Sequence, residues 1–203
     1  MKLLTVPREV MQSLYARVEL LTPHADLYFI YHVEPVARNC LMYAERFRQA
    51  GCFVDPVICQ LGGLFHDIGY TKEYEVEEKD HIDRGIVITS NILDEYAIGG
   101  VYKDKILDCI LTHDGNLSRS RYSCNNLIPL ENVIVNDVDA LCFFDWPFDK
   151  LIEFARDRLK APSLRESLRQ EAEKTLSYIH NPLFETFATV EHKVFMEKLQ
   201  KWN

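Results

Sequence analysis

The stretch Pro56–Tyr70, PVICQLGGLFHDIGY, decides the fold of this chain and holds its most informative pair of residues. An almost entirely apolar run leads straight into His66 and Asp67. A carboxylate at the end of a buried segment costs much free energy unless it is paired or bound to a metal. Because histidine is the commonest metal ligand in proteins, the adjacent pair indicates a metal site.

The same stretch predicts a buried helix that begins at Asp55-Pro56. Aspartate is a good N-cap, and proline is favoured at the first helical position. The pair Gly62-Gly63 lowers the helix propensity. It also permits the close approach of a neighbouring helix.

Apolar residues recur at helical spacing along most of the chain, and no series of alternating strand patterns is present. We therefore expect an all-α helical bundle, with any strand confined to a short hairpin. The helices before residue 148 are expected at 8–22, about 35–49, from 55, about 81–96, 103–113 and about 131–144, separated by loops that include 70–80 and 115–130. Residues 148–203 should form two or three helices, broken near Asn181-Pro182.

The composition is that of one globular domain with a true core. The chain has 203 residues, of which 47% are apolar and 27% are charged, with no long polar tract. We therefore expect a single helical domain over 1–203. Its metal-site core should cover about 28–145, followed by C-terminal helices over 148–203.

The charge balance is acidic, with a formal net charge of -8 and a pI of about 5.4. No basic cluster stands out, which argues against a nucleic-acid polymer or an anionic membrane surface as the partner. No apolar stretch approaches the length of a bilayer-spanning helix. An anionic substrate would need a local metal or a basic pocket to bind to such a chain.

Six cysteines are present, and none of them forms a Cys-x-x-Cys pair. A zinc knuckle is therefore not expected. Most of the cysteines lie in apolar stretches, as small buried residues of a protein from a reducing compartment do. Because the N-terminus lacks the pattern of a signal peptide, we expect a soluble cytoplasmic protein.

Further histidines and acids stand beside apolar sequence near the expected helix ends. Together with the central pair, the set is His32, His66, Asp67, His81, His113 and either Asp137 or Asp139. Residues near helix termini can converge on one cleft when helices pack as a bundle. The remaining histidines, His24, His180 and His192, are interpreted as ordinary structural or surface residues.

The order of this set resembles the HD-domain superfamily of metal-dependent phosphohydrolases. Its signature is a His, a His-Asp pair and a distant Asp on a helical bundle. The matching segments are YHVEPVARNCLMYAE with His32, LGGLFHDIGY with His66-Asp67, and VNDVDALCFF with Asp139. In members with two metals, two more histidines lie between the pair and the last Asp, where His81 and His113 stand here. The resemblance covers about residues 28–145.

Two positions depart from the family pattern or leave a choice. A basic residue usually follows the first His, whereas Glu34-Pro35 stand there in this chain. The last motif contains two acids. We favour Asp139, because the family places its acid before one residue and a leucine, as in Asp139-Ala140-Leu141. Asp137 is the alternative.

The resemblance implies a centre with one or two divalent ions. Adjacent helical residues point about 100° apart, so we propose that Asp67 uses its two oxygens to bridge two ions. One site would be completed by His32, His66 and Asp139, and the other by His81 and His113. Imidazoles and carboxylates suit Fe, Mn, Co, Ni or Zn better than Mg or Ca. Asp67 and His66 are the predicted catalytic residues.

The implied activity is hydrolysis of a phosphate ester by a metal-activated water. The partner would be a small phosphorylated molecule, with nucleotides as one candidate class. Lys72, Arg119 and Arg121 are candidate phosphate contacts. Two alternatives belong to other classes: a di-iron oxygenase of the same superfamily, and a non-catalytic helical ligand-binding protein.

Overall fold

Helices make up the regular secondary structure of residues 3–70, 81–122, 127–158 and 163–202, the ranges described by the computed structural model. Two short turns accompany them, and the order is α1 (Arg8–Leu21), η1 (Phe29–Val33), α2 (Glu34–Gln49), α3 (Pro56–Phe65), α4 (His81–Glu95), α5 (Gly100–Thr112), η3 (Leu117–Arg119), α6 (Leu130–Asp145), α7 (Phe148–Arg158), α8 (Leu164–Ser177) and α9 (Pro182–Lys201). No β-strand occurs within the described ranges, so the predicted all-α fold is confirmed.

Helix α3 lies in the middle of the packed helices, and eight of its ten residues are buried. It contacts α2, α5 and α6. Its first turn is held as the sequence predicts, because the Asp55 side chain accepts hydrogen bonds from the N–H groups of Val57 at 3.1 Å and Ile58 at 3.3 Å. Pro56 occupies the first helical position, where no N–H is needed.

The glycine pair of α3 allows the neighbouring helices to approach closely. A Cβ on Gly62 would lie 2.8 Å from Cβ of Cys109 on α5, and one on Gly63 would lie 3.1 Å from Cα of Ala37 on α2. Any larger residue would push these helices apart. Close packing on several sides therefore accounts for two residues that a helix otherwise disfavours.

Most observed helix boundaries follow the expected ones, but η1 extends the second helical segment back to Phe29, η3 lies within the expected 115–130 loop, and α5 begins earlier than expected. Helix α5 begins at Gly100 and not at 103, because Gly99 is extended and Gly100 adopts a positive φ of 60°. The glycine pair separates α4 from α5 as expected, and α5 starts at the second glycine of the pair. The predicted 70–80 loop lies outside the described residues, apart from Tyr70.

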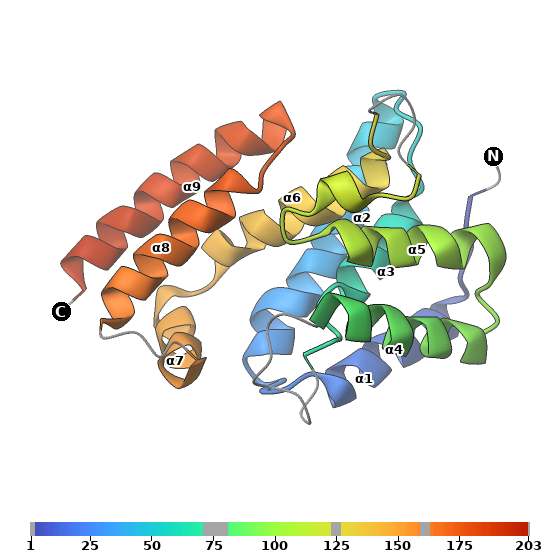
Figure 1. Ribbon diagram of the computed structural model, residues 1–203, viewed down its shortest axis with the longest axis horizontal. Helices are drawn as coiled ribbons and strands as arrows, with labels where there is room; N and C mark the ends of the chain where they lie inside the picture. The colour runs from blue at the N-terminus through green and yellow to red at the C-terminus, as the bar shows by residue number, and fades with distance from the viewer. Residues whose placement is uncertain (1–2, 71–80, 123–126, 159–162, 203) are drawn as a thin grey trace.

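Helices α8 and α9 form a pair that packs against α6 at one end of the molecule (Figure 1). The break between them occurs where the sequence predicts it. Asn181 accepts a hydrogen bond from the N–H of Leu183 at 3.0 Å, and Pro182 opens α9. Phe184 and Phe195 are among the side chains that α9 buries. None of the described helices is long and apolar enough to cross a membrane.

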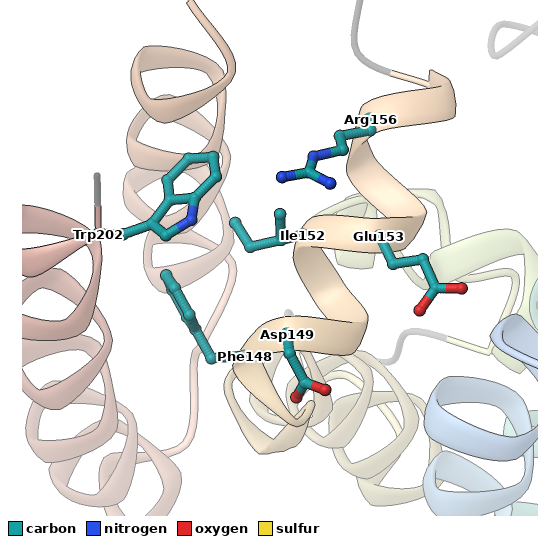
Figure 2. A pocket seen from close by; sticks show the side chains of 6 residues that line it. All are labelled: Phe148, Asp149, Ile152, Glu153, Arg156 and Trp202. Atoms are coloured by element: carbon teal, nitrogen blue, oxygen red, sulfur yellow. The ribbon is translucent and has the colours of Figure 1, made fainter.

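A surface hollow of about 420 Å³ lies between α7 and the end of α9. It is lined by Phe148, Asp149, Ile152, Glu153, Arg156 and Trp202 (Figure 2). Ile152 lines the hollow, whereas Phe154 stacks on Tyr28, which precedes η1. Residues two apart on a helix point about 200° apart, so α7 presents one face to the hollow and the other to the residues around η1.

Candidate metal centre

The structure brings the six candidate ligands together in two adjacent groups of three. The first group consists of His32 from η1, His66 from the end of α3 and Asp139 from α6. The second group consists of Asp67, which follows His66, His81 at the start of α4 and His113 at the end of α5. Within each group, one potential ligand atom of each residue lies within 4.8 Å of the other two.

The first group forms a nearly regular triangle of ligand atoms. Nε2 of His32 lies 3.1 Å from Nε2 of His66 and 3.2 Å from Oδ1 of Asp139. Nε2 of His66 lies 3.3 Å from the same Asp139 oxygen. Neighbouring ligands on one ion lie about 2.8–3.5 Å apart when the bonds are about 2.0–2.2 Å long. All three distances fit a shared ion.

The second group is slightly more open. Nε2 of His81 and Nε2 of His113 lie 3.3 Å apart. Oδ1 of Asp67 lies 3.4 Å from Nε2 of His113 and 3.9 Å from Nε2 of His81. A small movement of His81 would bring all three atoms to the distances of a shared ion.

Asp67 faces both groups with different oxygen atoms. Its Oδ1 is directed to the second group, as described above. Its Oδ2 lies 3.2 Å from Nε2 of His66 and 3.5 Å from Nε2 of His32. One carboxylate therefore extends across the space between the two groups, which is the geometry expected of a bridging ligand.

Backbone carbonyl groups orient two of the histidines. Nδ1 of His66 lies 2.7 Å from the carbonyl oxygen of Gly63, and Nδ1 of His113 lies 2.6 Å from that of Ile110. A carbonyl can only accept, so each ring donates from Nδ1. Both histidines follow the last residue of a helix, where the final carbonyls lack amide partners. In the neutral rings, Nε2 is then an unprotonated acceptor directed into the centre.

The centre concentrates acceptors that repel one another unless protons or a cation lie between them. Burial by itself would lower the pKa of His66, but Asp67 and Asp139 raise it well above its usual value. Burial would likewise raise the pKa of both carboxyls, but His66 foremost holds them well below their usual range. A divalent ion would replace these protons, because metals bind the neutral imidazole. The donor set therefore fits a metal centre.

The structure separates the two acids of α6. Asp139 belongs to the first group. Asp137 is buried elsewhere and accepts hydrogen bonds from the backbone N–H groups of His180 at 3.1 Å and Asn181 at 2.7 Å. Residues two apart on a helix point about 200° apart, so the two carboxylates cannot share one site. The geometry therefore favours Asp139 over Asp137 as a ligand.

Of the candidate phosphate contacts, Arg119 and Arg121 pair with acids outside the two groups. Arg119 pairs with Asp83 at 3.7 Å, and Arg121 lies 3.8 Å from the buried Asp108. Asp108 also accepts the backbone N–H of Arg121 at 2.8 Å, so it anchors this loop to α5. Lys72 lies outside the described residues. A substrate role for these three cations stays a prediction.

Two tyrosines that the sequence analysis did not select contact the candidate ligands. The hydroxyl of Tyr28 donates a hydrogen bond to Oδ2 of Asp67. The ring of Tyr70 stacks on His81, with centroids 4.3 Å apart and planes at 11°. Tyr28 stands four residues before His32, a spacing that places two side chains on the same face of a helical turn. That spacing is the signal that could have selected it.

A helical fold with a histidine- and carboxylate-rich centre defines a class of metal-binding protein, and the comparisons give its family. The model of the HD domain matches residues 29–143, more than half of the chain. The chain therefore belongs to the HD-domain family, most of whose members are metal-dependent phosphohydrolases. All six candidate ligands lie inside the matched region. No curated protein and no solved structure matches the chain.

Proposed function

We propose that this protein is a phosphohydrolase that uses two divalent ions to cleave a phosphate ester of a small molecule. The observation that carries the proposal is the position of Asp67. Its Oδ2 lies 3.2 Å from His66, and its Oδ1 lies 3.4 Å from His113. A carboxylate that faces two separate histidine groups with different oxygens is suited to hold a pair of ions in fixed relation.

Each group would hold one ion, and Asp67 would serve both. Four imidazole nitrogens with carboxylate oxygens suit Fe, Mn, Co, Ni or Zn. When bound, such ions lower the pKa of a coordinated water and neutralise charge on a phosphate. A net charge of -8 and ionised carboxylates at the centre would otherwise repel an anionic substrate. These features make the activity dependent on metal.

The residues of the centre differ in how far solvent reaches them. The Asp139 side chain is 18% exposed, whereas that of His66 is fully buried. A substrate would therefore approach from the side of Asp139, with His66 forming the floor of the centre. The carbonyl of Gly63 accepts from Nδ1 and holds the His66 ring, so that Nε2 is the nitrogen directed to an ion when the ring is neutral. The ligand atoms of the first group are therefore already at the distances of a shared ion.

The test is metal analysis of the purified protein, followed by removal of metal with a chelator and titration with each candidate ion. Hydrolysis of a panel of phosphate esters is then measured with each ion restored. We expect about two ions per chain and hydrolysis that disappears on chelation. A chain that neither retains nor binds metal would contradict the proposal and favour a helical ligand-binding protein. Oxygen consumption with iron, without hydrolysis, would favour the oxygenase.

A further inference from the structure

The hydroxyl of Tyr28 reaches the carboxylate that connects the two groups. It donates to Oδ2 of Asp67, the oxygen directed to the first group. Tyr28 is buried, with 8% of its surface exposed, so its hydroxyl gains from a partner inside the protein. Hydrogen bonds to an ionised acceptor are roughly twice as strong as neutral ones. This contact therefore has the strength to orient Asp67.

Orientation matters at this position because a carboxylate rotates easily about its terminal torsion. Asp67 faces both groups only in a narrow range of that rotation. Metal binding requires neutral imidazoles, and in neutral His66 and His113 the Nε2 atoms are acceptors that cannot hold a carboxylate oxygen by donating to it. A donor on Oδ2 can do so, and Tyr28 supplies one.

The local backbone places Tyr28 beside the centre. Residues Phe29–Val33 form a π-helical turn, closed by the N–H of Glu34 on the carbonyl of Phe29. Such turns are often found at functional sites. The rings of Tyr28 and His32 lie side by side, with centroids 5.0 Å apart. One turn of chain thus carries both a candidate ligand and the donor to Asp67.

Phe154 of α7 and Trp146, which follows α6, pack against the Tyr28 ring. Phe154 stacks on it with centroids 5.0 Å apart and planes at 10°, and Trp146 lies 6.3 Å away. Tyr28 and Phe154 both lie outside the residues 29–143 that match the HD domain. Helix α7 therefore contacts the centre through this pair of rings.

We propose that Tyr28 is a positioning residue of the metal centre. Its hydroxyl sets the rotation of the Asp67 carboxylate, so that Oδ2 faces the first group and Oδ1 the second. Phe154 holds the Tyr28 ring in the place from which the hydroxyl reaches Asp67. This inference rests on the proposed two-metal function.

The experiment compares metal-free wild type with Tyr28→Phe, which keeps the ring and removes the hydroxyl. Both are titrated with Co²⁺, and binding is followed by calorimetry and by the visible absorption bands of the bound ion. We expect Tyr28→Phe to lose about 10–100-fold in affinity for at least one ion, the usual effect of removing a supporting partner. Its absorption bands should also change, because the Asp67 carboxylate takes another orientation at the ion when its donor is removed.

Tyr31→Phe is the matched control, because Tyr31 lies three residues on and packs against Trp146 at 5.9 Å. It should bind Co²⁺ as the wild type does. Melting in the presence of chelator checks that each variant is folded. Should Tyr28→Phe melt much lower, Phe154→Leu is titrated instead, and a smaller loss of affinity is expected.

The outcomes separate the two proposals. Wild-type affinity and an unchanged Co²⁺ spectrum in folded Tyr28→Phe would overturn the positioning role and leave the metal centre standing. The same result in Phe154→Leu, where that variant is the one used, would also overturn it. A wild-type protein that binds no Co²⁺ or other candidate ion would instead overturn the proposed function on which the inference rests.

Discussion

The two ligand groups share one carboxylate but differ in how they are built and how far they are exposed. The first group joins residues from the two ends of the matched region, and its Asp139 side chain is 18% exposed. The second group is more deeply buried, with the side chains of His81 and His113 at 5% and 1% exposure. We infer that substrate meets the first group, and that the second holds its ion behind it.

The two groups also differ in how they are held before metal binds. His66 and His113 are oriented in the same way, each by a carbonyl three residues earlier. The difference lies at Asp67, whose Oδ2 has an additional donor in Tyr28. The first group is therefore the more firmly organised of the two, and the variants below test this difference.

The largest effect is expected from Asp67, because it faces both groups. Asp67→Ala should lose both ions, and hydrolysis should decrease by more than the roughly 100-fold that loss of a supporting partner costs. Asp67→Asn keeps the shape of the side chain and should show the same defect. His180→Ala, outside the centre, should retain metal and activity. Metal analysis and kinetics check this, and full metal with full activity in Asp67→Ala would refute the bridging role.

A smaller effect is expected from variants that belong to one group. Asp139→Asn should weaken the first ion, whereas His81→Gln or His113→Gln should remove about one equivalent of metal and leave the first site in place. The measurement is metal stoichiometry after gel filtration, with melting curves to confirm the fold. If His113→Gln lost both ions, the two groups would be one cooperative site and the comparison would fail.

Next in size is a difference in pH dependence between the metal-free and the metal-bound protein. The pKa of His66 is raised in the folded state, so its contribution to stability is complete below about 6.5 and is lost as the pH rises through the folded pKa. The pKa values of Asp67 and Asp139 are lowered in the folded state. Their contribution to the stability of the fold is therefore lost as the pH falls through these lowered pKa values.

Melting temperatures in chelator should therefore decrease on the alkaline side. Excess metal should remove this decrease, because the ion replaces the protons. The measurement is a melting series across about pH 5–9 with and without metal. Identical curves would show that the imidazoles do not hold the ion.

The smallest effect on metal binding is expected from Asp137→Ala, although this change should lower the stability of the fold. This change leaves the backbone N–H groups of His180 and Asn181 without their buried acceptor. The free energy of unfolding should decrease by about 1–3 kcal/mol, while metal stoichiometry stays unchanged. Denaturant unfolding measures the change in stability, and metal analysis measures the stoichiometry. Loss of metal without loss of stability would reverse the assignment of the two acids.

Much of the fold was predictable because its signals are local. The cap at Asp55-Pro56 and the break at Asn181-Pro182 act within one turn of chain, and both lie where the sequence predicts them. The start of α5 was three residues off, because Gly100 can enter a helix directly from a positive φ and spacing does not show this. Glycine at a helix start leaves little signal in a pattern of apolar residues.

The sequence predicts which residue types make up the candidate site. It does not predict which of the two acids joins the site or which neighbouring side chains hold the ligands. Asp137 and Asp139 both stand in an apolar helix, and only their neighbours in space separate them: two histidines for one and two backbone N–H groups for the other. In the sequence, Tyr28 is indistinguishable from an ordinary tyrosine of the hydrophobic core. Its hydroxyl acquires a role only because η1 and the end of α3 are adjacent.

The order of residues was enough to predict a helical chain, a resemblance to the HD-domain proteins and the residue types that could hold metal. Those conclusions depend on apolar periodicity, helix caps and the order of a few side chains, and all of these can be read directly from the amino-acid sequence. The tertiary structure decided which oxygen of Asp67 faces which group, which acid of α6 joins the centre and which donor orients the carboxylate. These depend on distances of about 3 Å between atoms on different helices, and hydrogen bonds and metal bonds are sensitive to such distances.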